Sequence, residues 1–219
     1  MATDSLVRRP LKSRNSRWAS LVAGLLIRAS VPPNVISVLS ILFAVCAGAS
    51  FLLVSRVDNI AAQIVLYLSA AVFIQLRLLC NLMDGMVAVE GGVRSRSGEV
   101  FNELPDRISD VVVLVSIGYS LAEFRYAREL AWSAALLAVL TAYIRLLGGS
   151  LRMPQDFSGP MAKPHRMAIL TVAALLSIVE ALLHYRGNIL MAALVIVAVG
   201  SIITFARRTA HLIRWLEDQ

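Results

Sequence analysis

Six long apolar segments account for most of this chain, and each is long enough to cross a lipid bilayer as a helix. A helical crossing needs about 20 predominantly apolar residues. The chain is 58% hydrophobic and 16% charged, whereas soluble domains are about 25% charged, so one soluble core could not bury its apolar surface. We therefore predict an all-α integral membrane protein with six transmembrane helices, at about residues 34–54, 58–89, 98–121, 129–151, 166–183 and 188–212.

The first 33 residues differ from the rest because they are basic and contain one short apolar run. That run, residues 18–27, ends at Arg28, and no small-residue cleavage site follows it, which argues against a cleaved signal peptide. We expect residues 1–33 to form a cytoplasmic segment whose apolar run is an amphipathic helix at the membrane interface. Residues 34–219 are expected to form one six-helix transmembrane domain, because no soluble insertion or linker divides them.

The basic residues are distributed unequally between the two ends of the predicted helices. The net charge is +7. If both termini are cytoplasmic, 14 Lys and Arg residues flank the helices on that side and 4 on the other. Cytoplasmic loops carry such an excess, and anionic lipid headgroups account for it better than nucleic acid does. We expect both termini and the loop after residue 90 in the cytoplasm, and the compact chain favours a bacterial or archaeal inner membrane.

Polar residues form matching faces on the second and third predicted helices. Asn81 and Asp84 are three residues apart, so they share one helix face. Asn102, Asp106 and Asp110 share a face of the next helix, at intervals of four. Helices joined by a short loop pack as antiparallel neighbours, and Mg²⁺ and Mn²⁺ prefer oxygen ligands. The sequence therefore predicts a cluster of oxygen ligands near the membrane surface.

The spacing of these residues resembles the signature of the CDP-alcohol phosphotransferase family, D-x2-D-G-x2-A-R-x8-G-x3-D-x3-D. Every interval of that signature is kept between residues 81 and 106. The six-helix pattern and the Pro-Pro-Asn before the first transmembrane segment also fit the family. Five positions carry the family's own residue: Asp84, Gly85, Ala88, Gly98 and Asp106.

The resemblance implies a metal-dependent transferase that works among membrane lipids and is commonly dimeric. In the family an alcohol attacks the β-phosphorus of a CDP-linked lipid, CMP leaves, and Mg²⁺ or Mn²⁺ ions hold the pyrophosphate. Carried over by position, Asp106 becomes the catalytic base. The implied metal ligands are Asn81, Asp84, Asn102 and Asp106. The implied nucleotide-facing residues are Gly85, Ala88 and Gly98.

Three positions depart from the signature. Asn81 and Asn102 stand where the family has aspartates, and Val89 stands where it has arginine. Each asparagine keeps an oxygen ligand but removes a negative charge, so two metal ions would be poorly compensated. We predict one tightly held ion, or recruitment of Glu103 or Asp110 as a further ligand. The alternative is a catalytically weak or inactive member that binds CDP-lipid or scaffolds other lipid enzymes.

A second pattern lies after the fourth transmembrane segment. Arg145 ends a Y-x-R sequence, and Lys163 and Arg166 fall on the basic positions of G-x-x-x-R-x-x-R. Both patterns are similar to those of the inositol-phosphate branch of the family. The three residues are therefore candidate acceptor-binding groups for an alcohol acceptor that carries a phosphate or another anion. Arg145 could instead be the structural partner of a carboxylate such as Asp106.

The remaining charged residues have open roles. Arg94 and Arg96 are candidates to replace the missing motif arginine at the nucleotide, or they are topology determinants only. Glu180 lies deep in a predicted helix, where it either makes a structural hydrogen bond or faces the ligand. Embedded charges such as Arg77 also occur in small transporters, but no inverted repeat accompanies them here.

Overall fold

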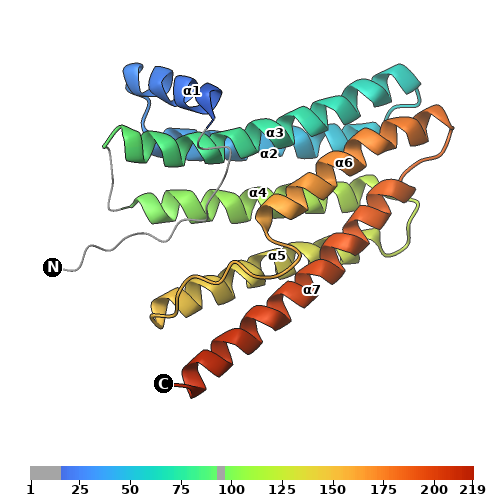
Figure 1. Cartoon of the computed structure of the whole chain (residues 1–219). Coiled ribbons are helices and arrows are strands. Elements are labelled where there is room, and N and C mark those ends of the chain that lie inside the picture. The colour runs from blue at the N-terminus through green and yellow to red at the C-terminus, as the bar shows by residue number, and fades with distance from the viewer. Residues whose placement is uncertain (1–15, 93–96) are drawn as a thin grey trace.

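The chain is helical throughout the part that the computed structural model describes, residues 16–92 and 97–219. Seven helices follow one another there, joined by short turns and one longer loop (Figure 1). They are α1 (Arg17–Arg28), α2 (Pro33–Val54), α3 (Ile60–Glu90), α4 (Gly98–Ser120), α5 (Ala127–Ser150), α6 (Lys163–Leu182) and α7 (Asn188–Glu217).

The helix boundaries agree with the predicted segments to within a few residues. The largest differences are at α6, which begins three residues early, and at α7, which continues to Glu217. Pro164 explains the first difference, because proline is favoured in the first turn of a helix, where its missing N–H is not needed. Pro105 lies inside α4 and does not end that helix.

Five of the described helices, α2, α3, α5, α6 and α7, are long and apolar enough to cross a membrane. The predicted all-α integral membrane fold is therefore confirmed. The helix α4 does not meet the same limit because it carries Glu99, Glu103, Asp106, Arg107 and Asp110. It packs against α2 and α5 within the bundle, and a sixth crossing stays a prediction.

Small residues fill the interior of the bundle, and large aliphatic residues cover its outside. The core includes a row of buried alanines on α5, at Ala131, Ala134 and Ala138. A Cβ added to Gly48 of α2 would lie 2.5 Å from Ser116 Oγ of α4. Transmembrane helices pack closely through small residues because lipid offers no hydrophobic drive to bury large ones. Exposed Leu, Val and Ile side chains are therefore expected on the lipid side.

The helix α1 packs across the C-terminal half of α3, as Figure 1 shows. Ala19 and Ala23 are fully buried against Met83 and Met86, whereas Trp18 and Leu25 on the other face are exposed. The predicted amphipathic helix is thus present. Its placement at a membrane interface, and the cytoplasmic segment before it, stay predictions.

Two ends of the bundle can be distinguished in Figure 1. The C-terminal end of α3 and the N-terminal ends of α2 and α4 lie together, and we name this the motif end. The α2–α3, α4–α5 and α6–α7 connections lie at the other end of these helices, which we name the opposite end. The signature residues between 81 and 106 therefore gather at the motif end.

Candidate active site

Asp84 lies on the buried face of α3 at the motif end and is 4% exposed. Ser37 of α2 donates a hydrogen bond from Oγ to Asp84 Oδ2 at 2.6 Å. The other carboxylate oxygen, Oδ1, is buried and accepts no hydrogen bond from the described residues. A buried carboxylate oxygen without a donor is costly, so Asp84 has an oxygen available for a ligand. Ser37 belongs to none of the sequence patterns that predict the site.

Asp106 of α4 shares this buried region with Asp84, and the two side chains interact electrostatically. Lys163, at the start of α6, forms an ion pair with Asp106 Oδ1. Arg77 Nη2 lies 3.9 Å from the same oxygen and donates to the Asp106 backbone carbonyl at 3.2 Å. Asp106 therefore has two cationic neighbours, which come from two other helices.

Asp110 joins three helices through a buried pair of arginines. Arg77 of α3 donates to Asp110 Oδ1 at 2.7 Å, and Arg166 of α6 donates to Asp110 Oδ2 at 2.6 Å. All three side chains are at most 2% exposed. Arg166 also donates to the Met161 carbonyl at 3.0 Å. Asp110 is thus engaged on both oxygens, which leaves no support for its recruitment as a metal ligand.

Glu103 is engaged in the same way, at the outer turn of α4. Arg145 Nη2 donates to Glu103 Oε1 at 2.6 Å, and Arg107 forms an ion pair with Glu103 Oε2. The structural partner of Arg145 is therefore Glu103 and not Asp106. Arg145 also donates to Gln155 at 3.1 Å, which ties the loop after α5 to the site.

The loop of residues 151–162 is fixed against α7. Arg208 of α7 donates to the Ser158 carbonyl at 2.9 Å, and His211 contacts Asp156 Oδ2 at 3.2 Å. Gly159 has a φ of 107° and approaches Thr204 so closely that a Cβ there would lie 2.6 Å from its methyl carbon, so glycine is required. Partial burial alone would raise the pKa of Asp156, but hydrogen bonds from Ser158 and His211 outweigh it and lower that pKa.

The other predicted site residues lie around this core with differing exposure. Asn81 is partly buried, and its Nδ2 has no hydrogen-bond partner among the described residues. Asn102 is exposed. Gly85, Ala88 and Gly98 are partly buried, and their nucleotide-facing role stays a prediction. The predicted roles of Arg94 and Arg96 fall outside the described residues.

These donors fit one divalent ion better than two. No group of three His, Cys, Asp or Glu side chains suited to a metal occurs among the described residues. Asp84 would supply its unpartnered buried oxygen, Asn81 its amide oxygen three residues earlier on α3, and Asp106 the second carboxylate. Two carboxylates balance one hard divalent cation with oxygen ligands. Two ions would leave positive charge uncompensated beside Lys163.

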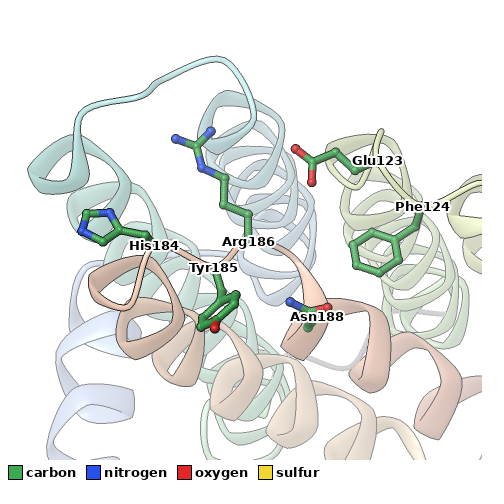
Figure 2. A pocket seen from close by; sticks show the side chains of 6 residues that line it. All are labelled: Glu123, Phe124, His184, Tyr185, Arg186 and Asn188. Atoms are coloured by element: carbon green, nitrogen blue, oxygen red, sulfur yellow. The ribbon is translucent and has the colours of Figure 1, made fainter.

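A different arrangement occupies the opposite end. Glu180 is 6% exposed and accepts hydrogen bonds from the Asn188 backbone N–H and Nδ2, both at 2.8 Å, and from Ile189 N at 3.3 Å. It therefore caps the first turn of α7, which settles its role as structural. An open cavity of about 430 Å³ lies nearby (Figure 2), contains no signature residue, and is lined by Glu123, Phe124, His184, Tyr185, Arg186 and Asn188.

Comparison with known families agrees with the arrangement at the motif end. The sequence matches the profile of the CDP-alcohol phosphatidyltransferase family over residues 30–204, which is most of the chain. The chain therefore belongs to this family of transferases. The family resemblance inferred from the spacing of residues 81–106 is confirmed.

Individual relatives agree in fold and in part of the sequence. Inner membrane protein YnbA of Escherichia coli (strain K12) is 29% identical over 114 residues, 50% of this chain and 53% of the relative, so the match spans about half of its length. Phosphatidylinositol phosphate synthase of Mycobacterium tuberculosis with CDP-DAG bound superposes with a TM-score of 0.72 at 22% identity, over 90% of this chain and 94% of that one. Its complex with manganese and citrate gives 0.70 at 21% identity, over 89% and 88%. At this identity the likeness shows a shared fold.

Proposed function

We propose that this chain transfers a phosphatidyl-type group from a CDP-linked lipid, such as CDP-diacylglycerol, to an alcohol acceptor and releases CMP. Membership of the family supports the reaction class, and a solved protein of the same fold holds CDP-DAG. The observation that carries the proposal is that Asp84 of α3 and Asp106 of α4 are both buried and lie close enough for their side chains to interact electrostatically. Asp84 has an oxygen without a donor among the described residues, and Asp106 forms an ion pair with Lys163.

The proposed mechanism places Asp106 as the general base. Its carboxylate takes the proton of the acceptor hydroxyl as the hydroxyl oxygen forms a bond to the β-phosphorus of the donor, and the phosphorus–oxygen bond to CMP breaks. The ion pair with Lys163 fixes the position of the Asp106 side chain. A divalent ion, Mg²⁺ or Mn²⁺, held by Asp84, Asp106 and Asn81 would polarise the pyrophosphate oxygens.

The surroundings of this site complete the proposal. Gly85, Ala88 and Gly98 leave room for the nucleotide at the motif end because they carry little or no side chain. The unequal distribution of basic residues supports a cytoplasmic motif end and cytoplasmic termini. On that basis the protein would work at the inner face of a bacterial or archaeal membrane, and a homodimer is part of the same proposal.

The test is release of CMP from CDP-diacylglycerol by the purified protein, with Mg²⁺ or Mn²⁺, over a panel of alcohol acceptors. Release that depends on the acceptor and falls about 10²–10⁴-fold in Asp106→Asn is expected from the loss of a general base. Binding of CDP-diacylglycerol without CMP release under any condition would reject the transferase. It would favour the inactive binder, for which the asparagines at 81 and 102 are the motivating observation.

A further inference from the structure

Every predicted acceptor-binding cation is already paired with a carboxylate of α4. Arg145 Nη2 lies 2.6 Å from Glu103 Oε1, and Arg166 Nη2 lies 2.6 Å from Asp110 Oδ2. Lys163 forms its ion pair with Asp106. These three side chains are at most 21% exposed. A bound phosphate would therefore meet a carboxylate beside each cation.

The pair of Lys163 with Asp106 involves a signature residue, and the pair of Arg166 with Asp110 is part of the buried core. The pair of Arg145 with Glu103 is neither. Asp106 is a signature position, and Asp110 is enclosed by Arg77 and Arg166. Glu103 lies between signature positions and bridges Arg107 and Arg145. Without its carboxylate, those two guanidinium groups would form a cationic cradle of the kind that binds phosphate.

The remaining donors of Arg145 are also engaged. Its Nη1 donates to Gln155 Oε1 at 3.1 Å. The guanidinium carbon lies 5.7 Å from the centre of the Phe157 ring, within cation–π range. An incoming anion would have to displace Glu103 from Arg145 or bind beside its negative charge.

We propose that the Glu103 carboxylate occupies the place that an acceptor phosphate would take, so that this chain uses an uncharged alcohol. The inference rests on the proposed transferase function and defines its acceptor class. It departs from the anionic acceptor that the second sequence pattern predicts. Glu103 acts here as a specificity-determining residue, through the charge it sets against Arg145 and Arg107.

Matched acceptor pairs test this proposal with the full-length protein: glycerol with glycerol 3-phosphate, and inositol with inositol phosphate. CMP release should favour the uncharged member of each pair by at least about 10-fold, because like charges brought together at a binding site strongly disfavour the wrong ligand. Glu103→Gln should shift the preference toward the phosphorylated member by a similar factor. Glu103→Asp keeps the charge and should keep the original preference.

Calorimetric binding of glycerol 3-phosphate gives a readout that needs no turnover. Glu103→Gln should bind it at least about 10-fold more tightly than the wild type does. Glu99→Gln removes the same charge from an exposed position on α4 and should match the wild type. Equal binding by wild type and Glu103→Gln, or a wild-type preference for phosphorylated acceptors, would overturn the proposal.

Failure of the proposed preference for uncharged acceptors can be distinguished from failure of the proposed transferase function. Absence of CMP release with every acceptor counts against the transferase, while the binding comparison still decides the role of the Glu103 charge. If Glu103→Gln does not fold, wild-type binding of glycerol 3-phosphate compared with glycerol decides it, because the proposal requires the phosphate to weaken binding.

Discussion

Two buried acids of nearly equal burial, one at each end of the bundle, have opposite hydrogen-bonding states. Glu180 at the opposite end is 6% exposed and accepts three hydrogen bonds from the first residues of α7. Asp84 at the motif end is 4% exposed, and its Oδ1 accepts none from the described residues. Buried polar groups are normally satisfied. Burial alone therefore does not separate a structural acid from one prepared for a ligand, whereas hydrogen-bond satisfaction does.

Asp110 sharpens this comparison because it lies on the same helix as Asp106 but, like Glu180, accepts hydrogen bonds on both carboxylate oxygens. Asp110→Asn should destabilise the protein by about 3–5 kcal/mol, since it leaves buried Arg166 without a carboxylate and Arg77 with only the more distant Asp106. Arg77→Met should cost less, because Asp110 keeps Arg166. Unfolding free energies in detergent micelles measure both. If Asp110→Asn were as stable as Arg77→Met, the two hydrogen bonds to Asp110 would not explain its contribution to stability.

Replacing Asp84 and Glu180 by their amides tests the comparison directly. Asp84→Asn should lower CMP release by at least about 100-fold, because it removes a charged ligand from the site, and should change stability little, because the amide can keep the Ser37 hydrogen bond. Glu180→Gln should do the reverse, with a stability loss of about 1–2 kcal/mol from weaker capping of α7. CMP release and unfolding are measured on both variants. Similar activity losses in the two would break the comparison.

Ser37 and Ser50 provide a matched pair on one helix. Ser37→Ala should reduce CMP release about 10-fold, equivalent to about 1.4 kcal/mol, because the hydroxyl orients the Asp84 carboxylate through a charged hydrogen bond. Ser50 is also buried, but its hydroxyl donates to the Cys46 carbonyl within α2. Ser50→Ala should therefore retain activity. An equal loss in the two variants would assign the effect to packing of α2.

The smallest expected effect is at the loop of residues 151–162. The lowered pKa of Asp156 means that its ionised form stabilises the folded protein. That contribution is present above the ordinary aspartate pKa of about 4 and is lost as the pH falls through the lower pKa of the folded state. Asp156→Asn should cost below about 1 kcal/mol at pH 7, and the difference from wild type should shrink as the pH falls below about 4. A difference that persists there would exclude the charge as its cause.

The fold could be predicted from the sequence because hydropathy and helix length record the contact of each segment with lipid. The boundaries of α2 and α3 follow from apolar runs of about 20 residues or more and the polar turn between them. The helix α4 is harder, because its charged face lies inside the bundle, where neighbouring helices compensate it. Composition does not contain that compensation, so hydropathy identifies α4 as a helix but not as a membrane crossing.

The candidate site could be predicted only where the sequence spacing is local. The interval between Asp84 and Asp106 spans one short loop and identified both residues. Ser37 is separated from Asp84 by 47 residues, and no pattern distinguishes it from Ser40 and Ser50 in the same largely apolar helix. The pairing of Arg145 with Glu103 spans 42 residues. The first pairing depends on how α2 packs against α3 and the second on how α5 packs against α4, which no single-helix pattern contains.

The buried bridge of Arg77, Asp110 and Arg166 has a consequence for synthesis of the chain. Its two pairs join residues 33 and 56 positions apart, so a nascent chain that has completed α4 still lacks half of the bridge. Asp110 gains its second partner only when α6 leaves the ribosome. We expect translation products arrested before Arg166 to be digested rapidly by protease and those arrested after α6 to resist it. Folding of the bundle during synthesis would then include a late step, in which Arg166 of α6 pairs with Asp110 of the already completed α4.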